Sequence, residues 1–134
     1  MFLLRKATPV LVVDRIEPIL PFWKKVGLTP TTEVPDASGS LAFVILAGEG
    51  IEIMYQTASS VKDDLVKSAS VKEAFRGVPQ QTTLFVEVAD LAEVESKLTD
   101  ELVIMPRRKT FYGSTEIGYS DPAGNIVVFA EHGD

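Results

Sequence analysis

The sequence predicts an α+β fold in which one β-α-β-β-β module occurs twice and the two modules form a cupped mixed sheet. The order of predicted elements is the same in residues 7–57 and 82–132. A shift of 75 residues also superimposes apolar positions of the two halves, such as Val13 on Val88 and Trp23 on Leu98. A repeated supersecondary unit explains both observations, because one such unit is too small to close a core alone.

The first predicted module begins with the short β-branched strand Ala7–Val13, in which Pro9 favours an edge or strand-start position. An apolar stripe at helical spacing then predicts a helix that ends at Gly27, a residue suited to the C-terminal cap. Pro18 and Pro21 fit this helix because both fall in its first turns. Three strands complete the module, at residues 28–35, 41–47 and 51–57.

Residues 58–81 predict a polar helical connector, with two short helices that begin at the capping boxes starting at Ser60 and Ser70. The second module then repeats the element order of the first. Asp90 and Glu93 form a third capping box for its helix. The strands on either side of this helix are predicted at residues 82–88 and 102–105.

The stretch Tyr112–Glu131 predicts a strand, a tight turn and a second strand. Its turn is Asp-Pro-Ala-Gly-Asn at residues 121–125, where Pro122 fixes φ and Gly124 tolerates positive φ. Apolar and polar residues alternate before the turn, and a β-branched run follows it. This pattern indicates a hairpin with one face against a core.

Composition limits the possible functions. The 134 residues fit a single domain, residues 1–134, and 46% of them are hydrophobic. The net charge of −6 argues against a nucleic-acid partner, and we interpret the basic cluster Arg107–Lys109 as a solvated loop. No apolar run approaches the roughly 18 residues of a membrane span, and residues 1–6 do not resemble a signal peptide. We therefore expect a cytoplasmic protein that uses no cysteine chemistry, since it has no cysteine.

Four segments carry a resemblance to a known family: Thr8–Leu11, Phe22–Leu28, Asp90–Leu91 and Asp121–Asn125. Together they make the chain similar to the vicinal-oxygen-chelate superfamily of glyoxalases, bleomycin resistance proteins and dioxygenases. The similarity is greatest with the bleomycin-resistance-like, metal-free branch. The resemblance implies the glyoxalase/bleomycin-resistance-like fold and a homodimer whose ligand clefts lie at or near the subunit interface.

In that superfamily a divalent metal is generally held by His, Gln or Glu from the first and last strands of each module. The matching positions in this chain are Thr8, Glu52, Thr83 and Val128. Only Glu52 offers a carboxylate or imidazole donor, whereas a metal site needs about three. We therefore expect no metal, no cofactor and no metal-dependent chemistry.

The predicted ligand site lies on one face of the last strand of the first module. Glu52, Met54 and Gln56 alternate there and share a face, opposite the core face formed by Ile51, Ile53 and Tyr55. Exposed loop aromatics often contact ligands, which adds Tyr112 to the site. The full set of predicted ligand-binding residues is Thr8, Glu52, Met54, Gln56, Thr83, Phe85, Tyr112, Glu116, Val128 and His132.

The sequence contains no motif for nucleotide binding or nucleophilic hydrolysis, and we assign no catalytic residue. We expect a small-molecule, antibiotic-like binding and sequestering protein whose ligand is cationic or aromatic. One alternative is a metal-dependent glyoxalase, lyase or extradiol-dioxygenase-like enzyme. A further alternative is a dimeric interaction module without a small ligand.

Overall fold

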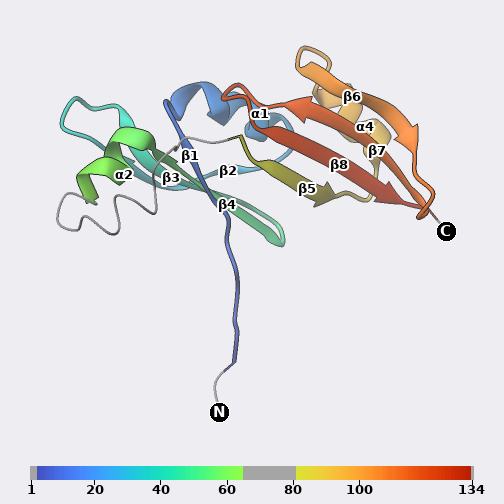
Figure 1. The fold of residues 1–134 in the computed structure, drawn as a ribbon, viewed down its shortest axis with the longest axis horizontal. Helices are drawn as coiled ribbons and strands as arrows, with labels where there is room; N and C mark the ends of the chain where they lie inside the picture. Colours follow the sequence, from blue (N-terminus) through green and yellow to red (C-terminus); the bar gives the residue numbers. More distant parts are fainter. Residues whose placement is uncertain (1–2, 65–80, 134) are drawn as a thin grey trace. The chain divides into compact units, whose positions relative to one another are not determined.

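The computed structural model describes residues 3–64 and 81–133 and contains two four-stranded sheets (Figure 1). The strand order is β1-β4-β3-β2 in one sheet and β5-β8-β7-β6 in the other. The strands are β1 (Val10–Val13), β2 (Thr29–Pro35), β3 (Leu41–Gly48), β4 (Ile51–Thr57), β5 (Thr83–Glu87), β6 (Leu102–Lys109), β7 (Ser114–Ser120) and β8 (Ile126–His132). The helices are the 3-10 turn η1 (Glu17–Ile19), α1 (Leu20–Lys25), α2 (Ala58–Asp64) and α4 (Leu91–Lys97).

The two sheets have the same topology. In each sheet the first strand of the repeat runs parallel to the last, and the remaining neighbours are antiparallel. The predicted α+β class and the repetition of one β-α-β-β-β order are confirmed. Within residues 3–64 and 81–133, no helix is long and apolar enough to cross a membrane.

The chain divides into two compact units, and α1 does not stay with the sheet of its own repeat. One unit holds β1–β4 and α2, and the other holds β5–β8, α4 and residues 18–27 with α1. Trp23 of α1 is fully buried and meets Phe22 and Phe129 edge to face, at ring-centroid distances of 5.3 and 6.3 Å. Trp23 is therefore a core residue of the second unit.

Local sequence signals place the first elements as expected. β1 begins directly after Pro9, whose carbonyl accepts the Met54 N–H at 3.0 Å, and it lies at a sheet edge. The strand is shorter than the predicted residues 7–13. Pro21 lies in the first turn of α1, and Gly27 follows the last turn with φ of 96°. The left-handed conformation at this position explains the glycine.

Two boundaries differ from the prediction. The connector helix α2 begins at Ala58, two residues before the predicted start, because the Thr57 hydroxyl accepts the Ser60 N–H at 3.3 Å and acts as the cap. The second predicted connector helix, at Ser70, lies outside the described residues. β6 extends to Lys109, since Pro106 sits on an edge strand, where a missing N–H is tolerated.

The hairpin turn between β7 and β8 follows its predicted chemistry. The buried Asp121 carboxylate accepts the backbone N–H groups of Ala123 at 2.9 Å and Asn125 at 2.8 Å. Gly124 has φ of 89°, which its lack of a side chain permits. The Asn125 side chain also accepts the Thr82 N–H at 2.8 Å. The turn thus fixes the start of β5 as well as the hairpin itself.

Candidate functional site

The candidate site of the second unit is built on one face of the sheet β5–β8. Side chains on the opposite face, such as Ile117 and Phe129, form the buried core. We call the other side the Glu116 face. The cross-strand pairs of β7 and β8 on the Glu116 face are Ser114–His132, Glu116–Ala130 and Gly118–Val128. On the other side of β8, Phe85 of β5 pairs with Val128. Five predicted residues therefore share this face: Thr83, Phe85, Glu116, Val128 and His132.

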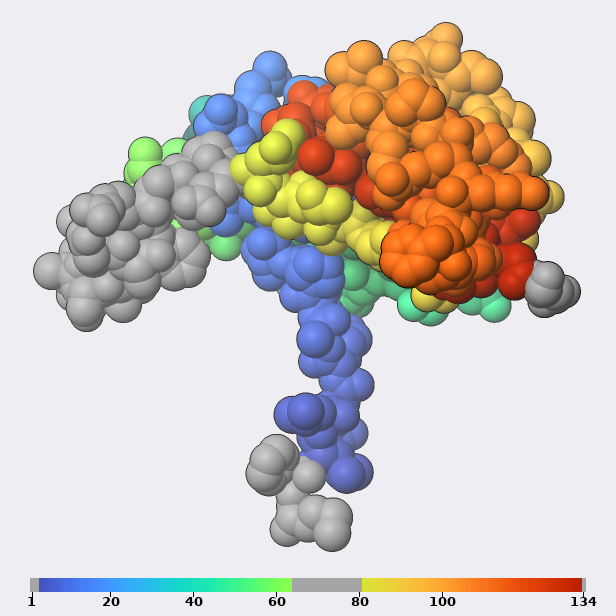
Figure 2. Space-filling view, turned by 45° about the vertical axis from the view of Figure 1, so that its right-hand side comes forward, coloured from blue at the N-terminus to red at the C-terminus, as the bar shows by residue number. Residues whose placement is uncertain are grey.

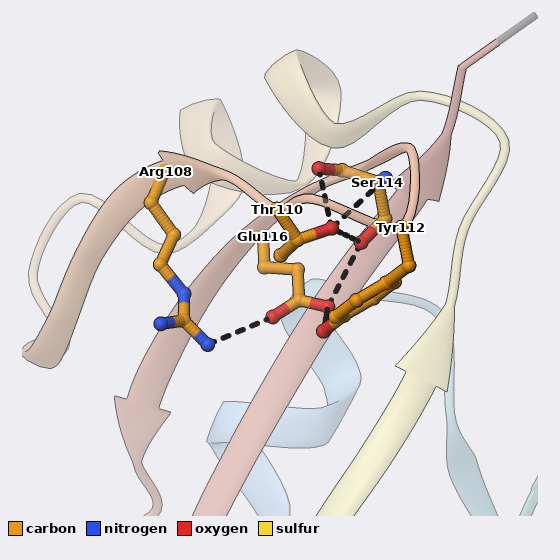
Figure 3. Close-up of polar contacts among 5 residues, drawn as sticks. All are labelled: Arg108, Thr110, Tyr112, Ser114 and Glu116. Carbon is orange, nitrogen blue, oxygen red and sulfur yellow. Dashed lines mark hydrogen bonds and ion pairs between the residues drawn. The ribbon is translucent and has the colours of Figure 1, made fainter.

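Glu116 is a buried carboxylate, with only 2% of its surface exposed. Three side chains donate hydrogen bonds to it: the Tyr112 hydroxyl at 2.5 Å, the Ser114 hydroxyl at 2.9 Å and the Arg108 Nη2 at 3.5 Å (Figure 3). The Tyr112 hydrogen bond does most to lower the pKa of Glu116, with help from Ser114 and Arg108 and against the effect of burial. Glu116 is therefore a fixed anion at neutral pH.

The loop at residues 110–113 is held in place by the same network. The Thr110 hydroxyl bonds the Ser114 hydroxyl at 2.9 Å and accepts the Ser114 N–H at 3.1 Å. Gly113 has φ of 89° and donates its N–H to the Thr110 carbonyl. The loop carries Phe111, which is 100% exposed, and Tyr112, which is half exposed. Their rings meet edge to face, with ring centroids 5.1 Å apart.

The first unit carries the other predicted residues. On β4, Ile53 and Tyr55 are buried, whereas Glu52, Met54 and Gln56 are half-buried, in agreement with the predicted strand phase. Ile51, expected on the core face, is also half-buried.

Glu52 and Thr8 meet at the edge of this first sheet. Glu52 Oε1 accepts hydrogen bonds from Lys6 Nζ at 3.0 Å and from the Thr8 hydroxyl at 3.3 Å. The three residues line a shallow groove of about 390 Å³, together with the β3–β4 turn. The carboxylate expected to attract a cationic ligand is thus already paired with Lys6.

The role of Arg108 was not predicted from the sequence. The interpretation of residues 107–109 as a solvated loop is wrong, because they continue β6 to its end. Arg107 and Arg108 therefore point to opposite faces: Arg107 pairs with Glu95 on α4, and Arg108 pairs with Glu116. Pro106 concealed the strand. One sequence signal for the longer strand was available. The strand that begins at Ser114 needs a paired strand, and residues 106–109 are placed to continue β6 opposite it.

Comparison with known proteins finds similarity in structure only. No family model and no curated protein sequence matches the chain. A bleomycin resistance determinant encoded on the transposon Tn5 superimposes with a TM-score of 0.65 at 14% identity, over 96% of this chain and 98% of that chain. A bleomycin-binding protein solved in complex with bleomycin gives 0.64 at 14% identity, over 97% and 100%. A glyoxalase-related enzyme from Fulvimarina pelagi gives 0.71 at 16% identity, over 97% and 89%.

This chain has the glyoxalase/bleomycin resistance fold. The structural likeness confirms the predicted fold. Nearly the full length of each protein takes part in the superposition, so the likeness covers both repeats and not one module alone.

Within the glyoxalase/bleomycin resistance fold, strand register corrects one position matched to the family's metal ligands. Val10 pairs with Met54, and its counterpart Phe85 pairs with Val128. Met54, rather than Glu52, is therefore the first-module equivalent of Val128. With this correction the four matched positions are Thr8, Met54, Thr83 and Val128, none of which has a carboxylate or imidazole. The described residues contain no group of three or more His, Cys, Asp or Glu that could hold a metal ion.

The lowered pKa of Glu116 predicts a pH-dependent contribution to stability. The carboxylate stabilises the fold fully above the usual carboxyl pKa of 4.5, and this stabilisation is lost as pH falls through the lower folded value. We expect Glu116→Gln to melt below the wild type at pH 7 and the difference to shrink in more acidic solution. Thermal melts of both proteins between pH 3 and 7 measure it.

Glu87→Gln is the matched control, because Glu87 is exposed on the same face and makes no hydrogen bond or ion pair with the described residues. Its melting temperature should stay close to the wild-type value at each pH. A Glu116→Gln difference that is equally large at pH 3 and pH 7 would contradict the role of the ionised carboxylate.

Proposed function

We propose that this chain binds a small molecule without the help of a metal ion. The observation that carries the proposal is the Phe111–Tyr112 pair, held on the Glu116 face by the short hydrogen bond from Tyr112 to a buried carboxylate. The bleomycin-binding protein of the same fold, solved with bleomycin bound, supports ligand binding by this architecture.

Preorganisation is the physical reason to assign a binding role to this pair. An exposed aromatic side chain normally loses rotamer freedom when a ligand covers it, which costs roughly 0.5–1.5 kcal/mol per side chain. The Tyr112 ring is already fixed by its hydroxyl group, and Phe111 packs against it edge to face. Structural needs do not explain a fully exposed Phe111, whereas recognition of an apolar or aromatic ligand does.

Metal independence is supported by the donors that this chain offers. Threonine hydroxyls, a thioether and an aliphatic side chain occupy the four matched positions, and divalent metal ions favour none of these over imidazole or carboxylate. Glu52 lies two residues before Met54 on the same strand and is paired with Lys6. We therefore favour sequestration of a ligand over turnover of a substrate, in the cytoplasmic setting that the sequence leads us to expect.

A homodimer is part of the proposal. The segment before β1 projects as an extended arm (Figure 2). Its residues Leu3 and Leu4 are 76% and 92% exposed, which is unusual for leucines in an isolated chain. The edge strand β2 is exposed along its whole length. Such edges are normally covered or guarded, and a second copy of the chain would cover them.

Ligand binding should depend on Phe111 while folding does not. A thermal-shift screen of aromatic small molecules identifies a binder, because a ligand that binds only the native state raises Tm. Phe111→Ala should then weaken that binder about tenfold, the equivalent of ~1.4 kcal/mol, and leave the melting temperature of the free protein unchanged. Isothermal titration measures the affinity.

Val34→Ala is the control, since Val34 is an exposed apolar residue on β2 in the other unit. Affinity should match the wild type in this variant. If a broad screen yields no binder, or if binders are indifferent to Phe111→Ala, the proposed site is wrong.

Metal analysis distinguishes this proposal from a metal-dependent enzyme. We expect the purified, untagged protein to carry no stoichiometric zinc, nickel, iron or manganese, and these ions to leave its melting temperature unchanged. The reason is that none of the four matched positions supplies a strong donor. Elemental analysis that finds close to one metal per chain, and loses it in Glu52→Ala, would overturn metal independence.

The homodimer has its own test. Light scattering at micromolar concentration should give twice the 14.6 kDa mass of one chain. Replacing Leu3 and Leu4 together with glutamate should shift the population toward monomer, because a charged arm resists burial. A monomer mass for the wild-type chain would remove the dimer from the proposal.

A further inference from the structure

Arg108 is held loosely compared with the rest of the Glu116 network. Its side chain is 56% exposed, and its only hydrogen bond or ion pair among the described residues joins Nη2 to Glu116 Oε1 at 3.5 Å. The other N–H groups of the guanidinium make no hydrogen bond to the residues that the structure describes. Most of the hydrogen-bonding capacity of this planar cation is therefore available to a ligand.

Glu116 does not depend on Arg108 for its main stabilisation. Its other oxygen, Oε2, accepts the two shorter hydrogen bonds, from Tyr112 at 2.5 Å and from Ser114 at 2.9 Å. Arg108 can thus turn toward a second anion while these two hydroxyl groups continue to satisfy the carboxylate. Figure 3 shows the guanidinium and the phenol approaching Glu116 from opposite sides.

A cationic ligand finds less to bind at the same place. Glu116 is buried beneath its donors, and a cation would have to displace either the phenol or the guanidinium. The exposed carboxylate on this face is Glu87. Glu87 and Glu116 both pair with Ala130, from opposite sides of β8, so they lie two strands apart, or about 10 Å at the usual strand spacing. The groups beside the aromatic pair therefore favour negative charge on the ligand.

We propose that Arg108 and the Phe111–Tyr112 pair form a subsite for an aromatic anion. The guanidinium binds a carboxylate of the ligand through two parallel N–H donors, and the exposed rings pack against its aromatic part. Charge-assisted, bidentate hydrogen bonds of this kind are stronger and more specific than neutral ones. The inference rests on the proposed function and names the class of ligand.

The probe is 2-naphthoate, compared with the neutral 2-naphthalenemethanol and the cationic 2-naphthylmethylamine, each titrated by calorimetry. We expect naphthoate to bind most tightly. Arg108→Gln should weaken naphthoate about tenfold, ~1.4 kcal/mol, and leave the neutral alcohol unchanged. Arg108→Lys should recover only part of the loss, because lysine keeps the charge but lacks the planar fork.

Arg107→Gln is the matched control, because Arg107 is the neighbouring arginine on the opposite face of β6, paired with Glu95. It should leave naphthoate affinity unchanged. Preferential binding of the amine, or naphthoate binding that is equally weakened by both arginine variants, overturns the aromatic-anion subsite. If the amine or alcohol binds tightly and responds to Phe111→Ala, the proposed binding function survives while this inference fails. Binding of none of the three probes also overturns the inference.

Discussion

The second unit depends on one electrostatic constraint, the burial of the Glu116 carboxylate. Removing a charge from water costs several kcal/mol unless hydrogen bonds and opposite charge replace the lost hydration. The replacement here comes from three places in the chain: β6, the loop after it and the start of β7. Satisfying one carboxylate therefore fixes the loop at residues 110–113, orients a phenol and brings an arginine onto the same face. The aromatic pair owes its position to this requirement.

The two repeats share topology but differ in their chemistry. In the first unit Glu52 is half-buried and is paired with Lys6 and Thr8, an arrangement of the kind that contributes little to stability at exposed sites. In the second unit the position in register with Glu52 holds an aliphatic residue, and the buried acid lies on the neighbouring strand instead. The two repeats thus have the same strand order, but their polar groups lie at different positions.

Local chemistry could be predicted from the sequence, whereas pairing between strands could not. The hairpin turn, the Asp90 cap and the glycine after α1 follow from side chains that act within a few residues. The apolar stripe of α1 predicts a helix but does not say which sheet buries Trp23. Arg108 and Glu116 are eight residues apart, and only the observed antiparallel register places them opposite each other. Strand register likewise places the counterpart of Val128 at Met54, two residues after the predicted Glu52.

The sign of the charge that a site prefers is set by nearby groups more than by the whole chain. The chain has a net charge of −6, and the expectation of a cationic ligand rested on the acidic residue Glu52, yet exposed charges are largely screened beyond about 8 Å at physiological ionic strength. Within that range of the aromatic pair, the acid is buried and already bonded, and the exposed group is a guanidinium. The buried acid Glu116 thus holds the cationic side chain of Arg108 at the surface. An acidic protein can present a site for anions in this way without any change in its overall charge.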